Sequence, residues 1–191
     1  PMLQNLEEYI ETDQNIVEKS ILHSLLAELY QMYFNTQQYK INRRTPITGY
    51  VPRNMAEWTG NIYREKIFQH ALDAVKARPQ LSEVNCLTYK EILVLGKNSP
   101  ALRPTMYDFL VYRSIDILNT ISRYNKQEPI TNKQLLFAPV KEFVQMPIEV
   151  KKMDAYSNTL KLYQSLLQSE IAAERTDAIL ISDLDRLEYA N

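Results

Sequence analysis

Residues 103–110, with the sequence RPTMYDFL, mark the start of a helix more clearly than any other stretch of the chain. Thr105 and Asp108 have the spacing of a capping box, in which each side chain bonds the backbone N–H of the other residue. Pro104 keeps the chain extended just before this cap. Apolar side chains then recur every three or four residues, which predicts an amphipathic helix. One side of that helix carries Met106, Phe109, Leu110, Ile117 and Ile121, with Arg113 among them.

Prolines divide the chain around this helix into windows in which other helices can run. A proline inside a helix costs about 3 kcal/mol, so long helices are expected only between prolines. Each window has apolar side chains at helical spacing. The long windows are residues 2–45, 53–78, 105–128 and 148–191.

The first two windows each predict one main helix. A long helix is expected over residues 13–39, with Asp13 as its N-cap and a short helix before it. A second amphipathic helix is expected over residues 62–75. Either Asn54 or Thr59 is suited to begin it, and the sequence does not decide between them.

The last window predicts two helices, over residues 160–171 and 180–187, with Thr176 or Asp177 as the cap between them. Leucines at helical spacing give the second of these helices an apolar side. That side consists of Leu180, Leu184 and Leu187.

Shorter features are expected between the main helices. Residues 87–95 predict a short helix, with Gly96 placed just after its end. Residues 40–53 and 126–150 are rich in breakers and predict exposed connectors, the second with one helical turn near 132–137.

Glycine content supports an all-α fold and excludes two catalytic motifs. The chain has 191 residues and 3 glycines, whereas average usage is about 7%. Hairpins use glycine at tight turns, so a hairpin-rich β fold is disfavoured. The glycines lie too far apart for a phosphate-binding loop or a Gly-x-Ser-x-Gly elbow. We therefore predict one all-α domain over residues 1–191, in which five or six main helices pack as antiparallel hairpins in an irregular bundle or short solenoid-like array.

Charge and hydropathy exclude two classes of partner. The net charge is −1, which provides no bulk attraction for nucleic acid. No apolar run approaches the roughly 18 residues of a membrane-spanning helix, so no direct membrane insertion is expected. The single cysteine, Cys86, has no internal partner, and we expect a buried, unreactive thiol.

Metal-binding and catalytic motifs are not evident, and no cofactor is expected. The two histidines, His23 and His70, lie on different predicted helices without a zinc-binding pattern. An enzyme that uses one of them with carboxylates from other helices remains an alternative. The basic residues Lys40, Arg43 and Arg44 are interpreted as part of an exposed linker.

Aromatic residues and one arginine are the remaining candidates. The chain has 13 tyrosines, many among apolar neighbours, which pack between helices or form an aromatic surface for another protein. Arg113 lies in an apolar stripe, where a salt bridge is more expected than substrate recognition. The candidate structural or interaction residues are Tyr30, Tyr33, Trp58, Arg103, Thr105, Tyr107, Asp108 and Arg113.

Several of these segments resemble one region of a known family. Residues 24–30 (SLLAELY) and 103–113 (RPTMYDFLVYR), with 56–59 (AEWT) between them and 160–167 (LKLYQSLL) after them, occur in a familiar order. The pattern resembles a helical segment near the N-terminal part of large alpha-2-macroglobulin-like proteins of Gram-negative bacteria. The resemblance spans residues 20–188.

The resemblance implies a location and a role for the parent protein. It implies a piece of a much longer, exported protein of the cell envelope or periplasm, associated with the outer membrane, that traps proteases as an endopeptidase inhibitor or serves envelope defence. Tyr112 stands where the family pattern has His, so no role of that His transfers here. Leu-Thr-Tyr follows Cys86, which does not match the Cys-Gly-Glu-Gln thioester of the family.

In this first hypothesis the chain is a non-enzymatic module that docks neighbouring domains or another protein through an aromatic-rich face. Two further hypotheses accompany it. A free-standing adaptor related to helix-pair repeat proteins would instead bind a peptide in a groove lined by tyrosines. The histidine-dependent enzyme is the third.

Overall fold

The computed structural model describes residues 2–47, 49–122 and 136–191, and this part of the chain is built from helices without a named strand. Six helices of eleven residues or more lie within it, which confirms the all-α prediction. They are α1 (Met2–Thr12), α2 (Ile16–Ile41), α3 (Gly60–Asp73), α6 (Met106–Ser122), α8 (Ala155–Ala172) and α9 (Thr176–Ala190). Shorter elements are the 3-10 turns η1 (Met55–Glu57) and η2 (Cys86–Tyr89) and the helices α4 (Arg78–Glu83), α5 (Ser99–Leu102) and α7 (Val140–Phe143).

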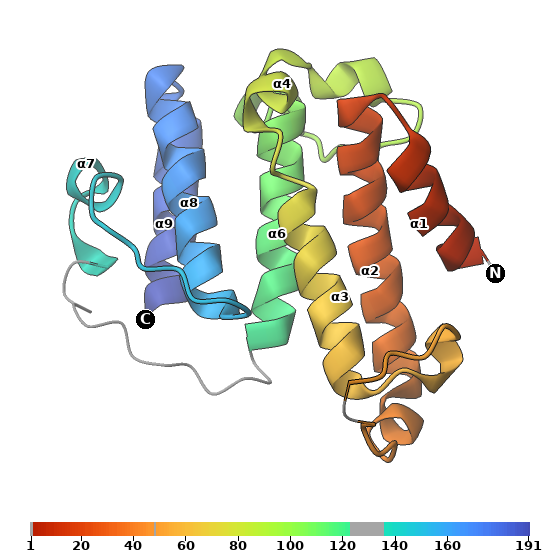
Figure 1. The fold of residues 1–191 in the computed structure, drawn as a ribbon. Coiled ribbons are helices and arrows are strands. Elements are labelled where there is room, and N and C mark those ends of the chain that lie inside the picture. Colours follow the sequence, from red (N-terminus) through yellow and green to blue (C-terminus); the bar gives the residue numbers. More distant parts are fainter. Residues whose placement is uncertain (1, 48, 123–135) are drawn as a thin grey trace.

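The long helices form a row in which each packs on the next (Figure 1). Two pairs are antiparallel hairpins, as predicted. His23 and Phe34 of α2 contact His70 and Tyr63 of α3 respectively, so their residue numbers run in opposite directions. α8 and α9 pack in the same way, and α8 packs against α6.

α2 and α6 are neighbours that run parallel to each other, which the hairpin prediction did not include. Arg113 of α6 bonds Ser24 and Glu28 of α2, and one to two turns later Gln31 of α2 donates to the carbonyl of Ile117 of α6. α3 lies between these two helices in the chain and packs on both of them.

The capping box that begins α6 is confirmed. The backbone N–H of Asp108 donates to Thr105 Oγ1 over 3.1 Å, and the N–H of Thr105 donates to Asp108 Oδ2 over 3.2 Å. The preceding chain is fixed by the backbone N–H of Cys86, which donates to the carbonyl of Pro104 over 2.8 Å. Asp108 fills the position in which a capping box usually has Glu. Its shorter side chain is sufficient because it is fully buried and lies within hydrogen-bond distance of the Thr105 hydroxyl.

The predicted start of α2 needs a correction. The N-cap of α2 is Asn15 and not Asp13, since Asn15 Oδ1 accepts from the N–H groups of Val17 and Glu18. Asp13 Oδ1 instead accepts from the N–H of Asn15 and orders the turn before the helix. Both starts suggested for the second helix are used, because Asn54 caps η1 and Thr59 precedes α3.

The short helix expected over residues 87–95 is wrong. Only the 3-10 turn η2 forms, capped by the Asn85 side chain, and the chain after residue 92 is irregular. Pro79 does not simply end a helix either. It lies in the first turn of α4, where its missing N–H costs nothing.

The buried side of α9 also differs from the leucine pattern. Leu180 and Leu184 are 61% and 57% exposed. The helix instead buries Ala178, Ser182 and Arg186, which recur every four residues. Ser182 bonds Glu170 of α8 and Arg186 bonds the carbonyls of Leu136 and Ala138, whereas Leu180 and Leu184 point outward.

The connectors agree with the prediction only in part. Residues 42–47 and 49–53 are largely exposed, as expected. Within 136–150, however, Leu136 and Phe143 are fully buried, so this part is not an exposed connector. Residues 123–135, with most of the predicted turn near 132–137, lie outside the described part of the chain. No helix in the described part is long and apolar enough to cross a lipid bilayer.

Candidate interaction surface

An open groove lies between the parallel helices α2 and α6. Its main part has a volume of about 460 Å³ and is also lined by residues 92–94 of the loop that follows η2. Nearly all of its lining is aliphatic or aromatic. The apolar lining residues are Ile21, Leu22, Leu25, Ile92, Leu93, Val94, Phe109 and Leu110.

The rim of the groove exposes side chains that usually lie in a core. Val94 is 96% exposed, Ile92 is 67% exposed and Leu25 is 37% exposed. Single exposed hydrophobic residues are normal, but several around one cavity are typical of an interaction site. We therefore define the apolar rim as Leu25, Ile92 and Val94.

A salt bridge crosses the groove at the end away from this loop. The Arg113 guanidinium donates to Glu28 Oε2 over 2.5 Å and to Ser24 Oγ over 2.9 Å, and it lies 5.7 Å from the centre of the Phe109 ring. The predicted salt bridge of Arg113 is thus confirmed. It joins α2 to α6 and lines both the apolar section and the cavity beyond it.

The groove continues beyond this salt bridge as a polar section. A second cavity of about 190 Å³ is also lined by Glu28 and Arg113, and it extends to Gln31, Asp116 and Thr120. A third, small cavity shares Gln31 and Thr120 and reaches α3. The α2 residues Ser24, Glu28, Gln31 and Asn35 follow each other along one stripe of that helix.

Most of the aromatic candidates lie in the core. Tyr30 is fully buried, Trp58 is 4% exposed, and their rings pack 5.4 Å apart. Tyr33 stacks on Tyr63, and the buried hydroxyl of Tyr107 bonds Ser165 of α8 over 2.5 Å. The expected aromatic-rich face is therefore wrong for these residues, and the alternative of rings packed between helices is confirmed for them.

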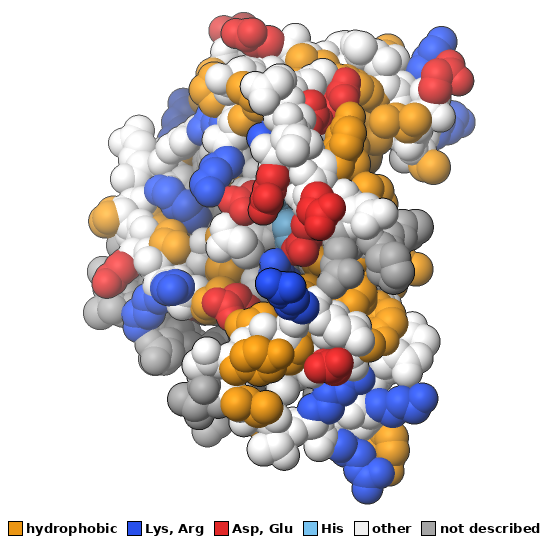
Figure 2. Space-filling view, turned by 45° about the vertical axis from the view of Figure 1, so that its right-hand side comes forward, with side chains coloured by type: hydrophobic (Ala, Val, Ile, Leu, Met, Phe, Trp, Pro, Cys, Tyr) orange, Lys and Arg blue, Asp and Glu red, His pale blue; other side chains and the backbone are white. Residues whose placement is uncertain are grey.

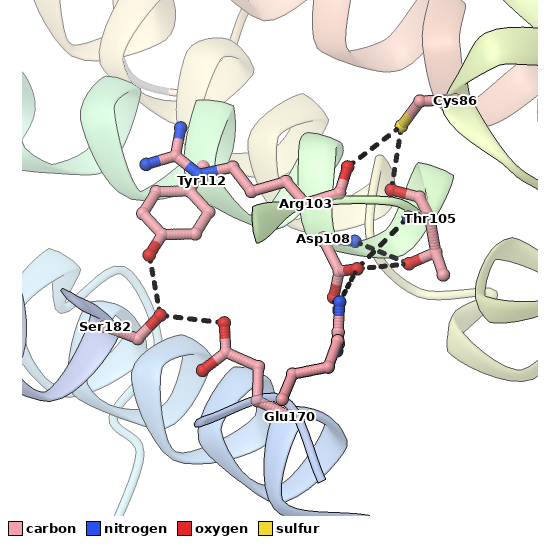
Figure 3. A network of polar contacts seen from close by, with 8 residues as sticks. Cys86, Arg103, Thr105, Asp108, Tyr112, Glu170 and Ser182 are labelled. Atoms are coloured by element: carbon pink, nitrogen blue, oxygen red, sulfur yellow. Dashed lines mark hydrogen bonds and ion pairs between the residues drawn. The ribbon is translucent and has the colours of Figure 1, made fainter. Parts of the chain in front are cut away.

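The other candidates belong to a buried polar network (Figure 3). Arg175 forms a bidentate pair with Asp108, over 2.5 and 3.0 Å. The Arg103 guanidinium lies over the ring of Tyr112, at 3.2 Å from its centre. These contacts fix the start of α6 against the turn between α8 and α9.

A hydrogen-bonded chain from α6 through α9 to α8 completes this network. The Tyr112 hydroxyl lies 2.6 Å from Ser182 Oγ, which donates to Glu170 Oε1 over 2.8 Å. Glu170 is fully buried, and this burial raises its pKa to about 7. A serine, a tyrosine and an acid with such a pKa resemble catalytic groups, but none of the described cavities is lined by any of the three. The arrangement can hold α6, α8 and α9 together.

The two histidines meet, which their separation of 47 residues did not predict. His23 Nδ1 and His70 Nδ1 are 2.8 Å apart, so one of them donates to the other. Glu7 of α1 lies 3.4 Å from His70 Nε2 and 2.7 Å from Lys66 Nζ. In Figure 2 the histidine surface is a small patch between acidic and basic side chains.

Electrostatics at this cluster favour a structural role. The hydrogen bond from His70 lowers the pKa of Glu7 to about 2, and burial lowers the pKa of His23 to about 4. Neither histidine lines a described cavity. No group of three or more potential ligands is placed to hold a metal ion within the described ranges.

Comparisons with protein-family models, with curated proteins and with solved structures give no match.

Cys86 is buried, as expected. Its thiol donates to the carbonyl of Thr105 over 3.0 Å, and burial raises its pKa to about 11. The thiolate is the reactive form, so this cysteine is poorly suited to nucleophilic chemistry.

Sequence patterns did not point to the groove. Its lining comes from four segments, residues 21–35, 64–67, 92–94 and 109–121, that are far apart in the chain. Ile92 and Val94 were expected within the short helix over residues 87–95, whereas in the structure both are exposed beyond η2. Only the parallel arrangement of α2 and α6 turns these residues into one surface.

Proposed function

We propose that this chain is a non-enzymatic helical docking module of an alpha-2-macroglobulin-like bacterial envelope protein. The observation that carries the docking role is the apolar rim around the 460 Å³ groove between α2 and α6. The titratable groups that sequence analysis singled out for chemistry are engaged in contacts between helices. They support an architectural role for the rest of the molecule.

The envelope setting comes from the resemblance and is proposed with it. In this setting the partner is a neighbouring domain of the parent chain or another protein, and protease trapping or envelope defence belongs to the parent protein. The full-length gene tests this part: it should continue well beyond Asn191 and begin with a secretory or lipoprotein signal. A stand-alone reading frame that ends here would contradict it.

A free-standing adaptor is the second candidate, because the same groove would serve it. Its expected tyrosine-lined surface is not supported, since no tyrosine lines the α2–α6 groove. The gene structure separates these two candidates.

Site-specific photo-cross-linking tests docking directly. A photoreactive amino acid is placed at Val94 in the producing cells, and its cross-links are mapped by mass spectrometry. We expect cross-links to one defined segment, and their loss when Leu25→Asp is added. Glu91, which is exposed in the same loop but does not line the groove, is the matched control position. Equal, scattered cross-linking from both positions would contradict a docking role.

A further inference from the structure

The groove has the length and direction of a missing helix. Its lining follows α2 from Ile21 to Asn35 and α6 from Phe109 to Ile121. At 1.5 Å per residue, this is about 20 Å, the length of a helix of about 14 residues. An extended strand would also need partners for its backbone groups, and the groove walls are helices whose backbone bonds are internal.

The helix directions favour one orientation of an occupant. α2 and α6 run parallel, and both are antiparallel to α3, which packs against them. Neighbouring helices in bundles usually alternate in direction. A helix antiparallel to α2 and α6 would continue the alternation already present, in which α1 and α3 run antiparallel to α2, and α3 and α8 to α6.

The chemistry of the groove changes along its length. The section near residues 92–94 is apolar and suits aliphatic side chains. The section beyond the salt bridge holds two carboxylates, Glu28 and Asp116, and one cation, Arg113. Arg113 is paired with Glu28, whereas Asp116 is exposed and has no ion pair with any described residue.

The charges of Arg103 and Arg113 both attract that of Asp116, but three carboxylates, Glu28, Asp116 and the nearby Asp185, outnumber these two cations. The polar end therefore keeps one net negative charge. A lysine or arginine of a bound helix would complement this negative charge, because its long side chain can extend past the Arg113–Glu28 pair to Asp116. The positive N-terminal end of an antiparallel helix would also lie toward this end of the groove.

We propose that the α2–α6 groove binds an amphipathic helix of a separate polypeptide, antiparallel to α2, with aliphatic anchors on the apolar rim and a basic residue facing Asp116. The inference rests on the proposed docking function and names the class of its partner. The anchors are expected at positions i, i+3 or i+4, and i+7.

Designed peptides test this class without knowledge of the natural partner. The probes are fluorescent 16-residue peptides with leucines at these positions, and with either Lys or Glu one to two turns before the first leucine. A scrambled peptide of the same composition is the control. Fluorescence anisotropy should show the Lys peptide binding about tenfold more tightly than the Glu peptide, because an attractive pair replaces a repulsive one.

Variants of the protein assign the binding to the groove. Asp116→Lys should reverse the preference between the two peptides. Leu25→Asp and Val94→Asp change exposed residues and should each abolish binding, while Leu184→Asp on α9 should leave it unchanged. Melting curves confirm that each variant is folded.

Several results would overturn the proposal. They are binding no better than that of the scrambled peptide, a preference that Asp116→Lys does not reverse, or a loss caused by Leu184→Asp alone. Dimers that Val94→Asp dissolves would make a second copy the occupant and would also overturn it. If no peptide binds while Val94 still cross-links one defined segment in cells, docking stands and only the helical class of partner fails.

Discussion

Asp108 is the residue with the most connected role in the buried network. Its carboxylate caps α6 through Thr105 and also pairs with Arg175 of the α8–α9 turn. It is fully buried, and the side chain of Arg175 is 16% exposed. Such a pair need not add much stability as a whole, but removal of one partner leaves the other charge buried and uncompensated.

We therefore expect Asp108→Asn to lower the free energy of unfolding by about 3 kcal/mol in urea denaturation. Thr105→Ser keeps the capping hydroxyl and is the matched control, with an expected change below about 1 kcal/mol. If both variants unfold at the wild-type urea concentration, the network does not hold α6 against the turn.

Glu170 predicts a specific pH dependence of stability. An ordinary carboxyl group in the unfolded chain releases its proton near pH 4.5, whereas burial in the folded protein raises the pKa of Glu170 to about 7. Between these values the folded state binds more protons, so stability falls as pH rises from about 4.5 through about 7. Glu170→Gln does not titrate and should lack this component.

The two proteins are compared by urea denaturation at pH 5 and pH 8. The wild type should lose on the order of 2 kcal/mol more than Glu170→Gln over this range. Glu174→Gln changes an exposed neighbour and should behave like the wild type. Identical losses in wild type and Glu170→Gln would show that Glu170 is not buried as described.

At the level of elements, α9 contradicts the usual interpretation of a leucine stripe. Arg186 is fully buried at its inner side, where it donates to the carbonyls of Leu136 and Ala138 and lies 4.4 Å from the centre of the Phe143 ring. Leu184 is more than half exposed on the outer side. The arginine thus ties the segment around α7 to α9.

Alanine substitutions distinguish the two sides of α9. Arg186→Ala should cost about 3 kcal/mol, because it leaves buried carbonyl groups without their donor, and should speed amide exchange across residues 140–144. Leu184→Ala should change the free energy of unfolding by less than about 0.5 kcal/mol. The reverse order of effects, measured by urea denaturation, would mean that α9 is rotated to bury its leucines.

Elements were predictable from the sequence where local interactions determine them. The capping box at Thr105 and Asp108, the Pro-free helices and the hairpins follow from spacing and sterics within a few residues. Apolar periodicity does not reveal which side of a helix faces the core when, as in α9, hydrogen-bonding side chains such as Ser182 and Arg186 are the buried ones. For residues 87–95, apolar content suggested a helix, but Asn85 caps only the short η2 turn.

At the scale of the whole molecule, the candidate surface depends on contacts between distant segments. The meeting of His23 with His70 and the groove between α2 and α6 arise from helix directions, which no single window of sequence encodes. Arg113 was identified because a charge in an apolar stripe requires a partner. Its partners Ser24 and Glu28 became evident only once the helices were placed together.

The central claim is that the α2–α6 groove is covered when the protein functions. Hydroxyl-radical footprinting measures this most directly, by comparing the purified chain with the protein inside the cells that produce it. The account predicts that Leu25, Ile92 and Val94 are oxidised in the purified chain and protected in cells, while Tyr39, which is 74% exposed and lies outside the groove, is oxidised equally in both. Equal oxidation of Leu25, Ile92 and Val94 in both settings would contradict it.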